Sequence, residues 1–173
     1  MPKLDLDAIP QTNATGYPAP FDADVQGRWY RRLAPASGLT RMGASHVTLK
    51  PGAFSSQRHW HRLEDELVVM LAGEAVLIED EGESIVRPGD VLAWAAGVEN
   101  GHRLHNRSTS DCVFVAVSAG DKARDSGAYP DIDMVFGRCN LAAETGRWSE
   151  PKTRIGWDAS RLLQHTMRRC FNA

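Results

Sequence analysis

The chain has 173 residues, a formal net charge of −2 at pH 7, 42% hydrophobic residues and 24% charged residues. This length predicts one domain whose core needs neither disulfides nor a metal for stability. The charge excludes a globally basic nucleic-acid-binding protein and an acidic tail protein, and the composition excludes a disordered chain. We therefore expect no nucleic-acid partner. We also expect no membrane partner, since no apolar run approaches the ~18 residues of a membrane span.

Residues 1–26 form a proline-bearing segment with small polar residues and no helical or strand period. This composition predicts an extended N-terminal arm that lies on the body of the protein or on a partner. The first residues contain no apolar stretch typical of a signal peptide. The three cysteines are widely spaced and form no CxxC pair. These features predict a cytoplasmic protein with reduced thiols.

Residues 27–119 carry short apolar runs at 67–71, 75–78, 91–94 and 113–117, with turn signals such as Gly73 and Gly89 between them. Runs of this length with turns this frequent predict an all-β sandwich or barrel. No segment with a helical period interrupts them, which argues against a parallel sheet built from βαβ units.

Residues 120–173 form a C-terminal extension that changes from irregular sequence to a helical period. We expect a short helix at 159–171 that packs on the barrel or on a second subunit. An alternative use of its basic face is the binding of an anionic partner. Its apolar face comprises Leu162, Leu163, Thr166, Met167, Cys170 and Phe171.

A metal site is indicated by His59 and His61, which point to the same side of a strand because side chains alternate. A carboxylate follows at the start of the next strand, and His102 arrives later. Three imidazoles and one carboxylate suit Zn, Fe, Mn, Ni or Cu and leave open positions for water or substrate.

The order and spacing of these residues resemble the two motifs of the cupin superfamily. The first motif matches Gly52, His59, His61, Glu66 and Gly73, with four residues between His61 and Glu66 and six between Glu66 and Gly73. The second matches Gly89-Asp90, Gly97, His102 and Asn106, although Ala95 stands where proline is usual. The gap before His59 is one residue longer than usual, and four residues instead of two separate Gly97 from His102.

The resemblance implies a double-stranded β-helix, the cupin jelly-roll barrel, with one divalent transition metal in its mouth. It assigns His59, His61, Glu66 and His102 as the ligands. Glu66 is preferred over Asp65 and Glu64 because only Glu66 has the motif's spacing of six residues to the glycine at position 73. It also implies a homodimer. A narrower resemblance is to small bacterial single-domain cupins often described as sugar-phosphate-isomerase-like. The runs that carry it include His59-Trp60-His61, Glu64-Asp65-Glu66, Pro88-Gly89-Asp90, Asn100-Gly101-His102 and Tyr129-Pro130-Asp131.

Three functions follow from this resemblance, all on a small-molecule substrate or ligand. The first is isomerase-type chemistry on a sugar phosphate, the second a non-haem metal dioxygenase or lyase, and the third a non-catalytic binding protein. The catalytic acid or base remains open among Glu64, Asp65 and Glu99. Five arginines near the ligands in sequence could bind an anionic group of the substrate. Because side chains alternate along a strand, Arg58, Arg62 and Arg103 should point away from the ligand side. For each of the five, a solvated position on the surface is an equal alternative. These arginines are Arg58, Arg62, Arg87, Arg103 and Arg107.

Overall fold

The computed structural model describes residues 3–132 and 134–137, which form twelve strands, a 3-10 turn and one short helix. In chain order the elements are β1 (Gln11–Thr12), η1 (Ala23–Val25), β2 (Arg28–Arg32), α1 (Leu33–Ala36), β3 (Gly43–Leu49), β4 (Trp60–His61), β5 (Glu64–Ala72), β6 (Ala75–Glu79), β7 (Gly82–Val86), β8 (Val91–Trp94), β9 (Arg103–His105), β10 (Cys112–Gly120), β11 (Ser126–Tyr129) and β12 (Met134–Gly137).

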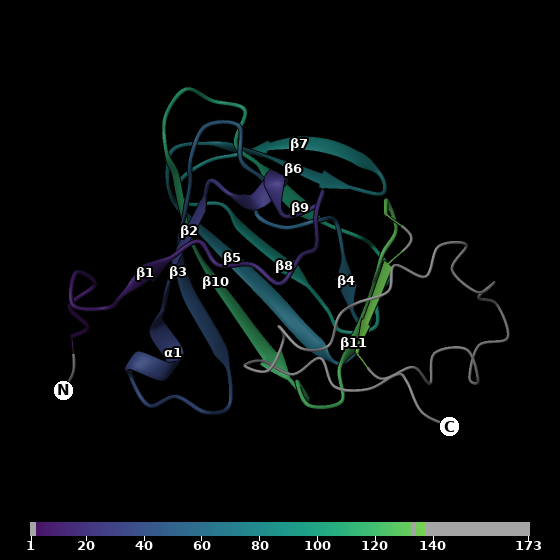
Figure 1. Ribbon diagram of the computed structural model, residues 1–173, viewed down its shortest axis with the longest axis horizontal. Coiled ribbons are helices and arrows are strands. Elements are labelled where there is room, and N and C mark those ends of the chain that lie inside the picture. Colours follow the sequence, from purple (N-terminus) through teal and green to yellow (C-terminus); the bar gives the residue numbers. More distant parts are fainter. Residues whose placement is uncertain (1–2, 133, 138–173) are drawn as a thin grey trace, which may run out of the picture.

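The strands form antiparallel sheets that wrap into a jelly-roll barrel (Figure 1). The largest sheet has the order β1-β2-β3-β10-β5-β8, and two three-stranded sheets have the orders β7-β6-β9 and β12-β11-β4. Every pairing within them is antiparallel. The expected all-β class and the double-stranded β-helix are confirmed.

The core lies on one face of the large sheet because its strands alternate apolar side chains inward. Phe114 of β10 stands opposite Val47 of β3 and Met70 of β5. These three side chains are between 1% and 5% exposed. Their neighbour Leu71 points to the other face and is 47% exposed. The period of two along β5 therefore separates a buried inner face from an outer face.

The turn between β5 and β6 requires glycine at position 73. Gly73 has a φ of +70°, a left-handed conformation that side chains rarely adopt. A Cβ atom there would lie 2.3 Å from the carbonyl oxygen of Asp111. This close approach explains in physical terms why the first motif ends on a glycine.

The N-terminal segment lies against the barrel along much of its length (Figure 1). β1 pairs with β2, the Tyr30 hydroxyl donates to the Ala14 carbonyl at 3.0 Å, and the Gln57 side-chain amide donates to the Phe21 carbonyl at 3.0 Å. The segment thereby brings its own side chains to the barrel wall.

The C-terminal helix expected at 159–171 lies outside the described residues. Within the described ranges, no helix is long and apolar enough to cross a membrane.

Candidate metal centre

The backbone brings His59 and His102 directly opposite each other. His102 donates its N–H to the His59 carbonyl at 2.9 Å, and His59 donates to the His102 carbonyl at 3.3 Å. Two residues that exchange backbone hydrogen bonds in this way project their side chains to the same side. The ring centroids of His59 and His102 are 5.2 Å apart, and those of His59 and His61 are 5.0 Å apart.

The three imidazoles converge on the carboxylate of Glu66, which projects inward from β5. The distances from Glu66 Oε2 to the three Nε2 atoms are 2.8 Å for His102, 3.7 Å for His61 and 3.8 Å for His59. The side chains of these residues are between 7% and 23% exposed, so the cluster is sheltered but open on one side. All four residues singled out from the sequence thus lie in one cluster.

The Nδ1 atom of each histidine is engaged on the side away from Glu66. His59 donates to the Gln57 carbonyl at 2.9 Å, His102 to the Asn100 carbonyl at 3.3 Å, and His61 to Asp125 Oδ2 at 2.5 Å. Because a carbonyl oxygen only accepts, the proton of the neutral His59 ring lies on Nδ1, and its Nε2 lone pair faces Glu66. His102 Nε2 donates to Glu66 Oε2 at 2.8 Å, and a bound metal would take the place of that proton.

Burial and neighbouring charges set the protonation of this cluster. Burial lowers the pKa of His59 to about 4, so its ring is neutral near pH 7. Burial alone would raise the pKa of Glu66, but the hydrogen bond with His102 and the nearby histidine charges outweigh it and lower that pKa to about 2. Burial likewise opposes the charged form of His61, yet the hydrogen bond to Asp125 raises its pKa overall. A neutral imidazole beside an ionised carboxylate is a donor set that suits a divalent transition metal.

Two further carboxylates lie behind His61. Asp125 accepts from His61 with one oxygen and from the Leu63 backbone N–H with the other, at 2.7 Å. Glu64, which is 6% exposed, places Oε2 3.9 Å from His61 Nδ1 and Oε1 3.9 Å from Lys122 Nζ. His61, Glu64 and Asp125 form a second group that could hold an ion. Asp125 and Glu64 both lie on the Nδ1 side of His61, whereas its Nε2 atom faces Glu66. We therefore interpret the two carboxylates as residues that orient His61 as a ligand, and not as a separate ion site.

The other two carboxylates considered as acid or base differ in their placement. The Asp65 carboxylate accepts the backbone N–H of Ala96 at 2.8 Å, on the exposed side of β5, and Glu99 is exposed. Of the three candidates, Glu64 therefore lies nearest the ligand cluster, on the Nδ1 side of His61.

Aromatic side chains wall the cluster. The Trp94 ring stacks on His102 with centroids 3.8 Å apart and planes 9° apart, and its indole N–H donates to Glu79 at 2.8 Å. The Phe136 ring lies 4.9 Å from that of His61, and the Tyr129 ring 5.8 Å from that of His59. These contacts fix the orientation of the imidazoles and make the surroundings apolar.

The arginines near the ligands in sequence are largely engaged elsewhere. Arg58 bonds to Asp131 at 2.7 Å and also to Asp80. Arg103 lies over the Phe54 ring at 4.3 Å. Arg87 pairs with Glu74 and Arg107 with Glu83. The alternation argument thus holds for Arg58 and Arg103, whose guanidinium groups contact other residues than the ligands.

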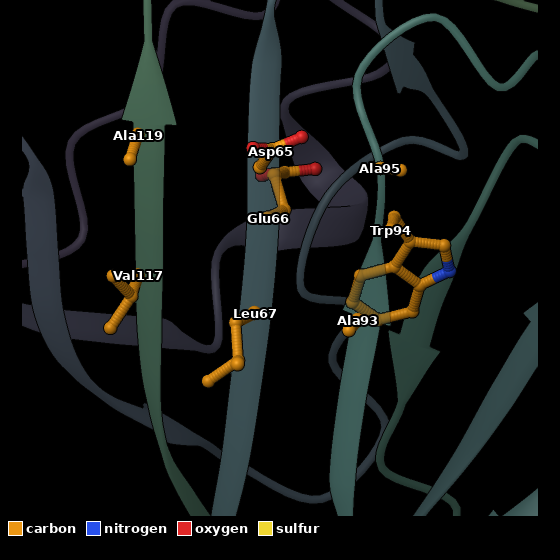
Figure 2. A pocket seen from close by; sticks show the side chains of 8 residues that line it. All are labelled: Asp65, Glu66, Leu67, Ala93, Trp94, Ala95, Val117 and Ala119. Atoms are coloured by element: carbon orange, nitrogen blue, oxygen red, sulfur yellow. The ribbon is translucent and has the colours of Figure 1, made fainter.

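A separate hollow of about 370 Å³ lies on the outer face of the large sheet (Figure 2). Leu67 stands opposite both Ala93 and Val117, and the alternation that sends Glu66 and Trp94 inward sends these three outward. Glu66 and Trp94 also line the hollow, but its other six residues, Asp65, Leu67, Ala93, Ala95, Val117 and Ala119, share the outward parity, so the hollow opens on the outer face of the sheet.

Several residues around the centre lie outside the two cupin motifs. Asp125 precedes β11, Tyr129 ends β11, Phe136 lies on β12, and Tyr17 comes from the N-terminal segment. Tyr129 belongs to the Tyr129-Pro130-Asp131 run of the narrower resemblance, whereas the other three carry no motif signal. A contact between residues more than 60 positions apart, such as that of His61 with Asp125, produces no periodic pattern in the sequence from which it could be predicted.

Comparisons with known proteins match the fold. A family model described as a cupin domain matches residues 45–118. A structure described as a cupin-superfamily sugar phosphate isomerase from Silicibacter pomeroyi is 39% identical, with a TM-score of 0.76, and the match covers 79% of this chain and 87% of that one. A candidate sugar phosphate isomerase from Acidithiobacillus ferrooxidans is 26% identical, with a TM-score of 0.61, covering 64% and 70%.

More distant structures share the fold alone. The polyketide cyclase RemF from Streptomyces resistomycificus is 19% identical, with a TM-score of 0.57, and the match covers 70% of this chain and 80% of that one. No curated protein matches the sequence.

Proposed function

The chain belongs to the cupin superfamily, and on that premise we propose that it is a metal-dependent enzyme that isomerises a phosphorylated sugar. The ligands would be His59, His61, Glu66 and His102. The observation that carries the proposal is the convergence of three Nε2 atoms on Glu66 while each Nδ1 atom is engaged behind. The 39% identical structure described as a sugar phosphate isomerase supports the reaction class.

The donor set fits a divalent ion such as Zn²⁺, Mn²⁺, Fe²⁺ or Ni²⁺, since three neutral nitrogens and one carboxylate leave a position for an oxygen ligand. A metal bound there supplies a Lewis acid for a carbonyl oxygen and a neighbouring hydroxyl. The carbonyls of Gln57 and Asn100 hold two of the imidazoles in place, so that little reorganisation accompanies binding.

The residues around the cluster suit a proton transfer between adjacent carbons. Trp94 and Phe136 exclude water from two sides of the histidines. Glu64 is buried next to His61, within reach of the Lys122 ammonium, and is the carboxylate that we assign to the proton shuttle. Because Glu64 lies on the Nδ1 side of His61, away from the open side of the cluster, a water molecule would have to relay the proton between Glu64 and the substrate.

The test is turnover by protein reconstituted with each of Zn²⁺, Mn²⁺, Fe²⁺ and Ni²⁺, assayed on a panel of aldose and ketose phosphates. We expect interconversion that ceases with a chelator and returns when metal is added. Deuterium from the solvent should appear at the carbon next to the carbonyl, as proton transfer requires. Absence of turnover and of exchange across the panel, with metal fully loaded, would refute the isomerase. Oxygen uptake by the iron-loaded protein would indicate the dioxygenase instead.

We further propose that a second copy of the chain covers the outer face of the large sheet. Leu67, Leu71 and Val91 lie on that face and are 36%, 47% and 59% exposed, next to the hollow of Figure 2. Apolar side chains of this size on a flat sheet face are typical of an interface. Leu71→Glu should convert a dimer into a monomer by light scattering without loss of bound metal. A wild-type protein that is a monomer at micromolar concentration would refute the proposal.

A further inference from the structure

Arg28 of β2 faces the interior of the barrel. It stands opposite Leu49 of β3, which is fully buried, and the next inward residue, Tyr30, stands opposite the buried Val47. Because side chains at alternate positions share a face, Arg28 and Tyr30 point to the same side as the core. This position differs from that of Arg58 and Arg107, whose guanidinium groups bond to exposed carboxylates.

The guanidinium group of Arg28 is incompletely paired. Nη1 donates to the Ser55 carbonyl at 2.9 Å, while Nε is buried without a hydrogen-bond partner. Within residues 3–132 and 134–137, no carboxylate forms an ion pair with Arg28, in contrast to Arg58 with Asp131. An arginine that faces the interior without a counter-ion has unused donors and an unbalanced positive charge.

Two aromatic rings connect the N-terminal segment with the candidate metal centre. The Tyr17 ring meets the Tyr129 ring edge to face at 5.6 Å, and Tyr129 in turn lies 5.8 Å from His59. Burial raises the pKa of Tyr17, the Arg28 charge lowers it in part, and the Glu66 charge raises it further. The Tyr17 hydroxyl therefore keeps its proton near pH 7. Arg28 and Tyr17 contact the same loop, because Arg28 donates to the carbonyl of Ser55 and the backbone N–H of Gln57, two residues later, donates to the Tyr17 hydroxyl.

The Tyr17 hydroxyl has two polar neighbours. Its oxygen accepts the backbone N–H of Gln57 at 3.2 Å, and it also forms a hydrogen bond with the Tyr129 side chain. That bond lowers the pKa of Tyr17 and raises the pKa of Tyr129, as expected when Tyr129 donates and Tyr17 accepts, so the proton of Tyr17 can be donated to a bound anion. Gln57 is also the residue whose carbonyl holds His59. The same short segment thus positions a proposed metal ligand and a phenol, and the segment before β2 supplies that phenol.

We propose that Arg28 and the Tyr17 hydroxyl form the subsite that binds the phosphate group of the substrate, while its carbonyl end lies at the metal centre. The assignment rests on the proposed function, since it places one end of the substrate at His59, His61, Glu66 and His102. The planar fork of arginine presents parallel N–H donors that match two phosphate oxygens, and the phenol supplies a neutral donor. The guanidinium carbon of Arg28 lies 5.4 Å from the centroid of the Tyr30 ring, and this cation–π contact helps to orient the guanidinium group.

The test is calorimetric titration of inorganic phosphate into wild type, Arg28→Gln, Arg28→Lys and the control Arg107→Gln, each with metal and after chelation. Arg107 is the matched control because it bonds to Glu83 at a partly exposed site outside the barrel. Loss of a charge-assisted contact should weaken phosphate binding by about 10- to 100-fold in Arg28→Gln. Arg28→Lys should retain part of the affinity, and Arg107→Gln should match wild type.

Metal content of the same samples separates the two claims. Wild-type metal content in Arg28→Gln together with weakened phosphate binding supports the subsite. Phosphate binding that is unchanged in Arg28→Gln, or that disappears entirely on chelation, would overturn it, since the anion would then bind elsewhere or at the metal. Failure of turnover with phosphate binding still dependent on Arg28 would overturn the isomerase and leave the phosphate subsite standing.

Discussion

Replacing Asp125 by asparagine tests how the proposed ligand His61 is held. The two carboxylate oxygens of Asp125 each accept one hydrogen bond, from His61 Nδ1 at 2.5 Å and from the Leu63 N–H at 2.7 Å. Asparagine has almost the same shape but only one acceptor oxygen. One of the two donors must therefore face an NH₂ group, and the side chain at 125, only 5% exposed, leaves little room for water to replace the lost acceptor.

The expected effect follows from the role of such partners in metal sites. Loss of a carboxylate behind a ligating histidine typically lowers metal affinity by about 10- to 100-fold, or ~1.4 to ~2.7 kcal/mol. The negative charge also raises the basicity of the His61 ring, since the hydrogen bond to Asp125 raises its pKa against the effect of burial. Both contributions should weaken binding in the variant.

The assay is a Zn²⁺ competition against a chromophoric chelator at pH 7.5, with Asp111→Asn as the control. Asp111 pairs with Lys50 at a partly exposed site at the edge of the barrel, so its replacement removes the same charge without touching the centre. An Asp125→Asn affinity within twofold of wild type would refute the reasoning, as would an equal loss in Asp111→Asn.

Two further changes test the fold. Met70→Ala should lower the free energy of unfolding by about 2–5 kcal/mol, measured in urea, because Met70 is 1% exposed. Ile85→Ala on β7, at a position 54% exposed and outside the proposed interface, should change it by less than about 1 kcal/mol. Equal effects would contradict the placement of Met70 in the core. The second change tests the ion pair between Arg58 and Asp131. Asp131→Asn should lower the free energy of unfolding by about 1 kcal/mol at pH 7, because Arg58 lowers the pKa of Asp131 below its ordinary value of 3.8. A depressed pKa stabilises the folded state above the unfolded value, so the difference from wild type should shrink as the pH falls below about 4, and a constant difference down to pH 2 would contradict this ion pair.

The barrel and the ligand cluster could be predicted because both follow from local patterns. Alternation along 67–71 and 113–117 specifies which residues face the core, and the spacing of His59 and His61 places two imidazoles on one side of a strand. His102 could be added only through the family motif, since the bridge to His59 depends on a pairing of segments more than 40 residues apart.

The rest of the site could not be read in this way. Asp125 and Tyr129 reach the ligands from β11 and the connection before it, in a region that the sequence shows as irregular. Several arginines near the ligands in sequence, such as Arg58 and Arg107, bind carboxylates away from the centre. Arg28 is distant in sequence, and its inward position becomes evident only from the pairing of β2 with β3.

The measurement that tests the central claim most directly is the metal content of purified protein by elemental analysis. The claim is that His59, His61, Glu66 and His102 bind one divalent ion. Wild type should carry about one equivalent of transition metal per chain, and the His59→Ala, His61→Ala, His102→Ala triple variant less than about a tenth of that, with the barrel intact by circular dichroism. Full metal content in the folded triple variant would contradict the account.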